Sequence, residues 1–220
     1  MKKALLLFLA MGIATFSQAQ FGFPKEIYLN PKMSNFSKTH KTIAILPVNV
    51  KFMYKTQQFD FDPEAEHIAE MNTSAIVQSN LYSFILTKSS KMSVEVQDVE
   101  TTNVLLKRAE VNDKITEFTK AELAKILGVD AVVSGMYEVE RPVAELPRHR
   151  FPPKPPVDPA KPGTAVDDRP VYYAAFTMNI NDGPSGTLLW RYYKKTGNFN
   201  TYDLSDDLIS KMVKDLPYSK

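Results

Sequence analysis

The apolar residues of this chain fall into short blocks whose spacing predicts strands and helices in turn. Residues 41–50 (KTIAILPVNV) are densely apolar and rich in β-branched side chains, which predicts a buried strand. Pro47 cannot donate a ladder hydrogen bond, so we expect it near the exit of this strand or at a bulge. Residues 92–99 (MSVEVQDV) alternate apolar and polar side chains and predict a second strand.

The longest helix is predicted to begin at Asp62 and Pro63 and to end between Thr87 and Ser90. Aspartate is a favoured N-cap, and proline is tolerated at the first helical position. A set of residues then recurs at three- and four-residue steps, which predicts one buried apolar face. The members of this face are Ile68, Met71, Ala75, Ile76, Ser79, Tyr82, Ile85 and Leu86.

A short helix and a central strand are predicted between residues 118 and 140. Thr119 and Glu122 have the spacing of a capping box, in which each side chain satisfies a backbone amide near the other. Gly128 stands where a left-handed residue closes a helix. Residues 130–139 begin with consecutive apolar side chains, which predicts a strand that is covered on both faces.

The rest of the chain completes an α/β pattern. A short helix is expected at 103–111, and residues 20–40 are interpreted as a tether or an arm that follows an edge of the sheet. Residues 141–170 contain nine prolines and are predicted to be a long loop within one domain. A hairpin of residues 171–180 and 186–197 and a helix near 204–216 follow. The order predicts one α/β domain, 41–216, with packed helices and a mixed sheet of about five strands.

The first residues have the pattern of a secretory leader. Lys2 and Lys3 precede the apolar run Ala4 to Phe16, and "SQAQ" places small residues where signal peptidase cleaves. We therefore expect a signal peptide at 1–19, with cleavage between Ala19 and Gln20. The apolar run is shorter than the ~20 residues of a membrane-spanning helix, which disfavours an uncleaved anchor and predicts no transmembrane span after processing. The chain has no cysteine, so a lipidated cysteine at the cleavage site is excluded.

Charge disfavours one class of partner. The chain has 27 basic and 25 acidic residues, and removal of the two leader lysines makes the numbers equal. A chain without net charge has no overall field that attracts phosphate backbones, so we expect no nucleic-acid partner.

Candidate catalytic motifs are incomplete. Val132 and Thr187 stand where a nucleophile elbow around Ser134 or Ser185 needs glycine. KTG at 195–197 lacks the serine–lysine box that accompanies it in penicillin-recognising enzymes. The histidines His40, His67 and His149 are far apart and are interpreted as solvated surface residues. Asp60 and Asp62 are explained by helix entry more simply than by a cation. We therefore expect no catalytic residue, no metal and no cofactor.

Aromatic and arginine side chains concentrate on the predicted hairpin and in the preceding loop. Both types are favoured anchors of protein interfaces, which makes these residues candidates for partner binding. Strand alternation sends neighbouring tyrosines to opposite faces, so the alternative is that half of the set is sheet core and the rest packs under the loop. The candidates are Arg148, Arg150, Phe151, Tyr172, Tyr173, Trp190, Tyr192 and Tyr193.

Three segments resemble a known superfamily: KTIAILPV at 41–48, NVLLKRAEVND at 103–113 and AELAKILGVDAVVSGMYEVE at 121–140. They look like the bacterial envelope proteins that include the curli-secretion component CsgG, and the amino-terminal domain of TolB and small lipoprotein activators of penicillin-binding proteins share that general fold. The resemblance implies a non-enzymatic part in envelope assembly, secretion or scaffolding. Pore formation is disfavoured here, because a proline-rich insertion could not satisfy its backbone in lipid.

The leading hypothesis is therefore an adaptor or scaffold, periplasmic or associated with the outer membrane, that binds envelope proteins through its proline-rich loop and aromatic hairpin. One alternative is an exported hydrolase or sugar-binding enzyme whose acidic groups converge only in the folded chain. Another is a self-assembling structural subunit, which would be a homo-oligomer.

Overall fold

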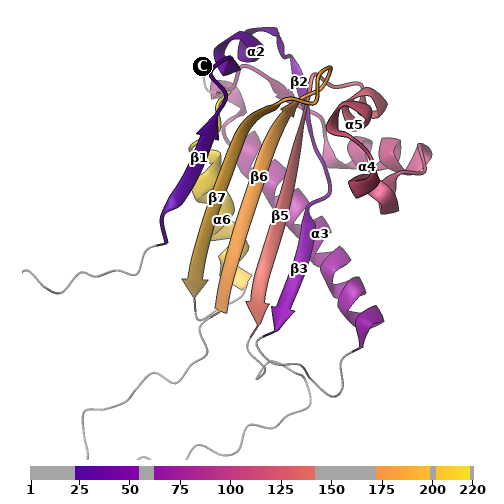
Figure 1. Ribbon diagram of the computed structural model, residues 1–220, viewed down its shortest axis with the longest axis vertical. Coiled ribbons are helices and arrows are strands. Elements are labelled where there is room, and N and C mark those ends of the chain that lie inside the picture. Colours follow the sequence, from indigo (N-terminus) through magenta and orange to yellow (C-terminus); the bar gives the residue numbers. More distant parts are fainter. Residues whose placement is uncertain (1–22, 55–61, 142–171, 199–201, 219–220) are drawn as a thin grey trace, which may run out of the picture.

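The protein is described by a computed structural model that covers residues 23–54, 62–141, 172–198 and 202–218. Its strands form one mixed sheet in the order β1-β7-β6-β5-β2-β4, and β3 pairs with β5 beside β2 (Figure 1). The strands are β1 Lys25–Leu29, β2 Thr42–Ile45, β3 Asn49–Tyr54, β4 Glu95–Val96, β5 Ala131–Arg141, β6 Tyr172–Asp182 and β7 Leu188–Asn198. The helices are α2 Met33–Thr39, α3 Pro63–Leu86, α4 Val99–Arg108, α5 Lys120–Leu127 and α6 Tyr202–Val213, with short 3₁₀ helices at Ser89–Lys91 and Asn112–Glu117.

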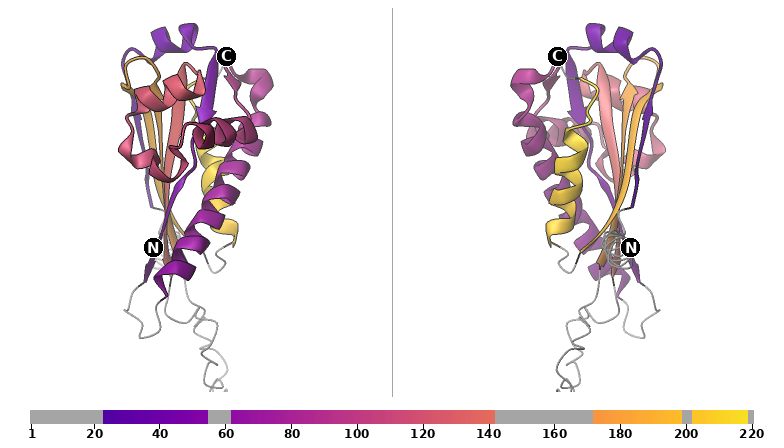
Figure 2. Two further views of the ribbon diagram at one scale, coloured as in Figure 1. Left: turned by 90° about the vertical axis from the view of Figure 1, so that its right-hand side faces the viewer. Right: turned by 90° about the vertical axis from the view of Figure 1, so that its left-hand side faces the viewer.

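The helices cover the sheet unequally. α3 and α6 lie side by side against one face, whereas α4 and α5 cover only one end of the molecule (Figure 2). A large apolar cluster fills the space between the sheet and α3 and α6, and includes Ile45, Val133, Phe176 and Trp190. Alternation sends Val132 to the opposite face, where it joins a smaller cluster with α4 and α5. Much of the sheet face that is turned to the viewer in Figure 1 therefore carries no helix.

The predicted strand at 41–50 is divided in two at Pro47. β2 pairs with Ala131–Val133 of β5, and β3 pairs with Met136–Arg141 of the same strand. The prediction that Pro47 lies at the exit of a strand is confirmed, because β2 ends at Ile45. The interruption leaves two β5 residues, Ser134 and Gly135, without a partner strand on this side.

The α/β class and the mixed sheet are confirmed, although the described residues contain seven strands rather than about five. One additional strand is β3, and the other is β1, which comes from the expected arm at 20–40. β1 pairs with β7 at the edge of the sheet, so the arm follows an edge and is not a free tether. The hairpin of β6 and β7 is confirmed. The expected strand at 92–99 shrinks to β4, and the helix expected at 103–111 begins earlier, after the N-cap Asp98.

The helix ends confirm the capping predictions. The Asp62 carboxylate accepts hydrogen bonds from the backbone amides of Glu64 and Ala65, at the start of α3. Thr119 and Glu122 form the complete capping box of α5, and Gly128 closes that helix with a φ of 68°. Only glycine adopts this left-handed conformation without strain, so this one residue ends the helix and releases the chain into β5.

The predicted buried face of α3 is wrong. The side chains that α3 buries are Val77, Gln78, Leu81 and Ile85, and of these only Ile85 belongs to the predicted set. Most of the predicted face is exposed, with Ile68 at 52%, Met71 at 50%, Ile76 at 58% and Leu86 at 43%. The helix carries apolar residues on two sides, so its spacing alone did not decide which side packs on the sheet.

Candidate functional site

A groove lies beside the break between β2 and β3. It has a volume of about 660 Å³ and lies between residues 47–51, α3 and α4. Met71, Ala75 and Val104 give it apolar walls, and Met71 and Val104 are 50% and 39% exposed. Charged side chains from the same three segments also line it, namely Lys51, Glu70, Glu100 and Lys107, together with His67.

Gln78 is the residue that fixes the width of this groove. Its side-chain amide donates to the Ile45 carbonyl at 2.8 Å, at the point where β2 ends. The same amide exchanges hydrogen bonds with the Asn103 amide of α4, at 3.1 and 3.2 Å. Since a buried amide must be hydrogen-bonded, this arrangement holds α3, α4 and the strand break in one geometry.

A hydrolase would need a carboxylate in the groove that is free to transfer protons. Glu70 already accepts a hydrogen bond from the Phe52 backbone amide at 3.1 Å and one from Lys51 Nζ at 3.4 Å. Both of its oxygens therefore help to hold β3 against α3. Glu100 also lines the groove. A carboxylate engaged with backbone in this way is less available as a general acid or base.

A second, more polar hollow of about 350 Å³ lies on the other side of the strand break. Lys120, Ser134 and Asn179 line it, and it shares residues 47–49 with the groove. Burial lowers the pKa of the Lys120 ammonium. The Asn179 side-chain oxygen is buried and accepts no hydrogen bond from any described residue. These groups could bind a polar group of a ligand or ordered water.

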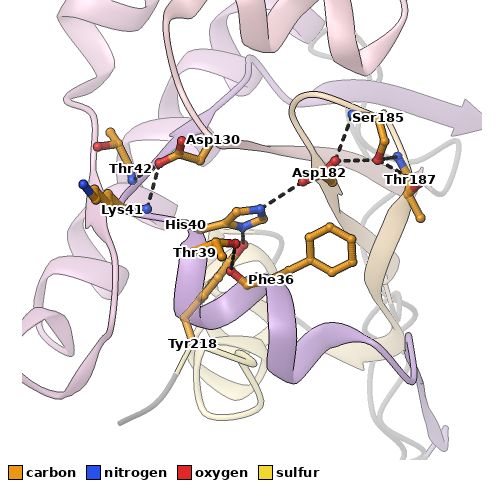
Figure 3. Close-up of polar contacts among 10 residues, drawn as sticks. All are labelled: Phe36, Thr39, His40, Lys41, Thr42, Asp130, Asp182, Ser185, Thr187 and Tyr218. Atoms are coloured by element: carbon orange, nitrogen blue, oxygen red, sulfur yellow. Dashed lines mark hydrogen bonds and ion pairs between the residues drawn. The ribbon is translucent and has the colours of Figure 1, made fainter.

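A buried polar cluster joins three distant parts of the chain at one end of the sheet (Figure 3). His40 Nε2 lies 3.0 Å from Asp182 Oδ1, and His40 Nδ1 lies 2.7 Å from the Tyr218 hydroxyl. The other Asp182 oxygen accepts hydrogen bonds from the backbone amide and the hydroxyl of Ser185. The prediction that His40 is a solvated surface residue is therefore wrong, because its partners lie far away in sequence. His67 is exposed as expected, and His149 lies outside the described residues.

This cluster contains serine, histidine and aspartate but not in a catalytic order. In a catalytic triad the serine hydroxyl bonds to histidine, which accepts its proton. Here the Ser185 hydroxyl donates to Asp182 and not to His40, so the histidine is not placed to accept the serine proton. The arrangement supports a structural role, in which His40 links the β6–β7 turn to Tyr218 near the end of the chain.

Two carboxylates at this end of the sheet are stabilised in their charged form. Burial by itself raises the pKa of Asp182, but hydrogen bonds from Ser185 and His40 outweigh it and hold the pKa below the ordinary 3.8. Burial likewise opposes ionisation of Asp130, and the backbone amides of Thr42 and Lys41 outweigh it and lower that pKa. Burial raises the pKa of the Tyr218 hydroxyl.

These shifts predict an acid-sensitive fold. A carboxyl whose pKa is lower in the folded than in the unfolded state stabilises the fold above the unfolded value of about 4, and this contribution is lost as pH falls through the folded pKa. We therefore expect the free energy of unfolding, measured with urea, to decrease progressively below about pH 4. In Asp182→Asn, which cannot ionise at this position, the decrease should be smaller. An equal decrease in both chains would contradict the assignment to Asp182.

The predicted partner-binding residues do not form one surface. Trp190 and Tyr192 are 1% and 0% exposed and stack in the core at 5.9 Å, which corrects their assignment to a partner-binding surface. Burial raises the pKa of Tyr192 to about 12. Tyr173 and Tyr193 are half-buried and stand on the opposite, largely uncovered face. Arg148, Arg150 and Phe151 lie outside the described residues, as do the cleavage site Ala19–Gln20 and Asp60, and the Tyr172 side chain is not described.

Tyr173 takes part in a small aromatic cluster on that face. Its ring meets the Phe23 ring edge-on at 5.9 Å, and Lys195 Nζ lies 5.1 Å from the Tyr173 centroid and 5.4 Å from that of Phe23. These contacts attach the chain just before β1 to the outer part of the hairpin. For Tyr173 and Tyr193, partner binding stays a prediction.

The groove residues were not predicted from the sequence as a site. Pro47 was recognised as an interruption, and Met71 was assigned to a buried helix face, but nothing local connects either residue to Val104 of α4. In the part of the chain that is described, no group of three or more histidine, cysteine or acidic side chains could hold a metal ion. No helix of that part is both long enough and apolar enough to cross a bilayer.

Comparison with protein-family models and with curated proteins finds no match. Among solved structures, a PelC dodecamer from Paraburkholderia phytofirmans is 14% identical and has a TM-score of 0.40, with 90% of this chain and 99% of that chain covered. Lipoprotein GNA1162 from Neisseria meningitidis is 15% identical, with a TM-score of 0.40 and coverage of 80% and 96%. The LpoB C-terminal domain from Escherichia coli is 7% identical, with a TM-score of 0.33 and coverage of 76% and 94%. At these identities and TM-scores, none of the three decides a function for this chain.

Proposed function

We propose that this chain is an exported adaptor of the bacterial cell envelope, without a catalytic centre, which binds a segment of a partner protein in the groove between α3, α4 and the strand break. The observation that carries the proposal is the composition of the groove, which has exposed apolar side chains between charged ones. Protein interfaces have this anatomy, with an apolar centre and a polar rim.

The groove is also preformed, and this favours binding. The Gln78–Asn103 pair and the Gln78 bond to the Ile45 carbonyl hold its walls in place without a ligand. A rigid site does not have to be ordered when a partner binds, so less of the interaction free energy is lost. The volume of about 660 Å³ has room for a few side chains of an inserted segment.

The location of the adaptor rests on the leader-like residues 1–19, which support export to the periplasm or the outer membrane. The absence of cysteine from this sequence supports a chain without a lipid anchor of the lipoprotein type. The resemblance of residues 41–216 to the superfamily of CsgG and the TolB amino-terminal domain, and a docking role for the loop at 141–170, stay predictions.

Val104 gives the most direct test. Its side chain is 39% exposed and lines the groove, so Val104→Asp should place an unpaired charge in the interface with little effect on the fold. We expect capture of partner proteins from cross-linked envelopes to fall at least tenfold, which corresponds to the ~1.4 kcal/mol or more expected for loss of an interface anchor.

Met53→Asp is the matched control for this experiment. Met53 is 45% exposed, but it lies on the uncovered sheet face and does not line the groove. Capture should therefore be unchanged in this variant. Loss of capture in Met53→Asp with normal capture in Val104→Asp would overturn the groove proposal and would place the partner on the sheet face.

A further inference from the structure

α3 carries a mostly apolar stripe whose outer residues Ile68, Ser79 and Leu86 are exposed. Met71 and Ala75 of the stripe border the groove, and Tyr82 packs partly against the main core. Successive helical residues are turned by about 100°, so the members of the stripe lie within an arc of about 80°. All of them are exposed except Tyr82, which is half-buried. The stripe consists of Ile68, Met71, Ala75, Ser79, Tyr82 and Leu86.

The other sides of α3 are occupied. Val77, Leu81 and Ile85 pack on the sheet. On one flank Asn80 donates to Asp206 of α6 at 2.8 Å, and on the other Gln78 pairs with Asn103 of α4. At 100° per residue, the outer members of the stripe, Ile68, Ser79 and Leu86, lie between these two flanks and are turned away from the sheet. A regular apolar stripe along a long helix is typical of a helix that packs on two sides.

The spacing of the stripe fits a second copy of the same helix. Ile68 and Leu86 stand equally far from residue 77, and so do Ala75 and Ser79. In an antiparallel pair related by a twofold axis at residue 77, Ile68 of each copy therefore meets Leu86 of the other. The small side chains of Ala75 and Ser79 meet at the crossing point, where they allow the two backbones to approach closely.

Charge favours the same orientation. Glu64 is exposed at the beginning of α3, whereas Lys88 and Lys91 are exposed just beyond its end, and none of the three forms an ion pair with another described residue. An antiparallel pair brings the acidic end of each copy to the basic end of the other and also aligns the helix dipoles favourably. A parallel pair would place like charges together.

We propose that the exported chain forms a symmetric homodimer through the α3 stripe, with the two helices antiparallel. Such an interface is self-complementary and closed, because each patch is used once and no further copy can be added. The proposal does not depend on the groove, although Met71 and Ala75 belong both to the stripe and to the groove wall.

The association itself is tested by sedimentation equilibrium of the chain from Gln20 onward, between about 1 and about 100 µM. Ser79→Glu should weaken dimerisation at least tenfold, because it places a charge at the apolar crossing. Ser34→Glu, an exposed serine of α2, is the matched control and should leave dimerisation unchanged. A chain that stays monomeric at about 100 µM, or a dimer that Ser79→Glu does not weaken, would overturn the proposal.

Orientation is tested by cross-linking, because the natural chain contains no cysteine. In the proposed dimer a mixture of Ile68→Cys and Leu86→Cys chains should form a disulfide-linked pair under mild oxidation. Each variant alone should not, since like positions are about 27 Å apart along two antiparallel helices.

Efficient self-linking of each variant alone would show a parallel pair, and absence of any link would show that the stripe is not the interface. Either result refutes the proposal. Val104→Asp should leave these links intact, which separates a failure of this proposal from a failure of the groove proposal.

Discussion

Replacing Asp182 by alanine is expected to lower the free energy of unfolding by about 2–3 kcal/mol, the upper part of the range for leaving a buried polar group without its hydrogen-bond partner. Asp182 accepts hydrogen bonds from His40 and from the amide and hydroxyl of Ser185, and its side chain is only 6% exposed. Without the carboxylate, the buried His40 ring loses its partner at Nε2 and cannot reach water instead, whereas the exposed Ser185 can bond to solvent. Urea unfolding of the chain from Gln20 onward measures the loss.

An ion pair at the surface provides the comparison. Lys25 and Asp215 form a salt bridge of 2.8 Å, but the lysine side chain is 51% exposed. Water and salt screen such a pair, so Asp215→Ala should cost about 1 kcal/mol or less. If Asp182→Ala lowered the free energy of unfolding no more than Asp215→Ala, the cluster around His40 would not stabilise the fold as proposed.

Trp190→Ala is the second large effect, with an expected loss of about 3–5 kcal/mol. The indole is 1% exposed and stacks on Tyr192 under α6, so its removal leaves a cavity in the main core. The structure around a rigid sheet collapses only partly into such a space, and the lost contacts are not replaced. Urea unfolding of the same chain gives the value.

Tyr193→Ala is the control, because Tyr193 stands three residues after Trp190 on β7 and lies half-buried on the other face. Its loss should cost about 1 kcal/mol, as for most partly exposed positions. If Trp190→Ala had near-normal stability but no longer captured a partner, Trp190 would be a partner-binding residue and not a core residue.

Local chemistry made parts of this fold predictable. The capping box of Thr119 and Glu122, the stop at Gly128 and the N-cap Asp62 involve atoms only a few residues apart, so their sequence patterns determine their structure. Strand alternation likewise separates Tyr192 from Tyr193. Alternation does not show which face of the sheet the helices cover. The sequence therefore predicts Trp190 and Tyr192 on a surface, whereas α6 covers their face.

The incorrect predictions concern contacts between distant residues. His40 is separated from Asp182 by 142 residues and from Tyr218 by 178, and nothing beside it in sequence indicates burial. The five residues of β1 are all exposed and lack a buried pattern, so this strand depends on its pairing with β7. The groove combines three segments in the same way, since Met71, Val104 and Pro47 meet only after α3 and α4 have packed against the strand break.

α3 shows how a correct pattern can be misinterpreted. Six of the eight residues of the predicted face lie in one stripe, but the sheet packs on another apolar side, which includes Ile85. Periodicity shows which residues share a helix face, but it does not show what packs against that face. Ile68, Ser79 and Leu86 of the stripe are exposed in the described chain, and the proposed dimer would bury them.

The central claim is that the groove binds a partner protein, and site-specific photo-cross-linking in living cells tests it most directly. A photoreactive amino acid at position 104 should give a discrete adduct with another envelope protein, and the same probe at position 53, on the uncovered sheet face, should give none. An adduct from position 53 with none from position 104 would contradict the claim.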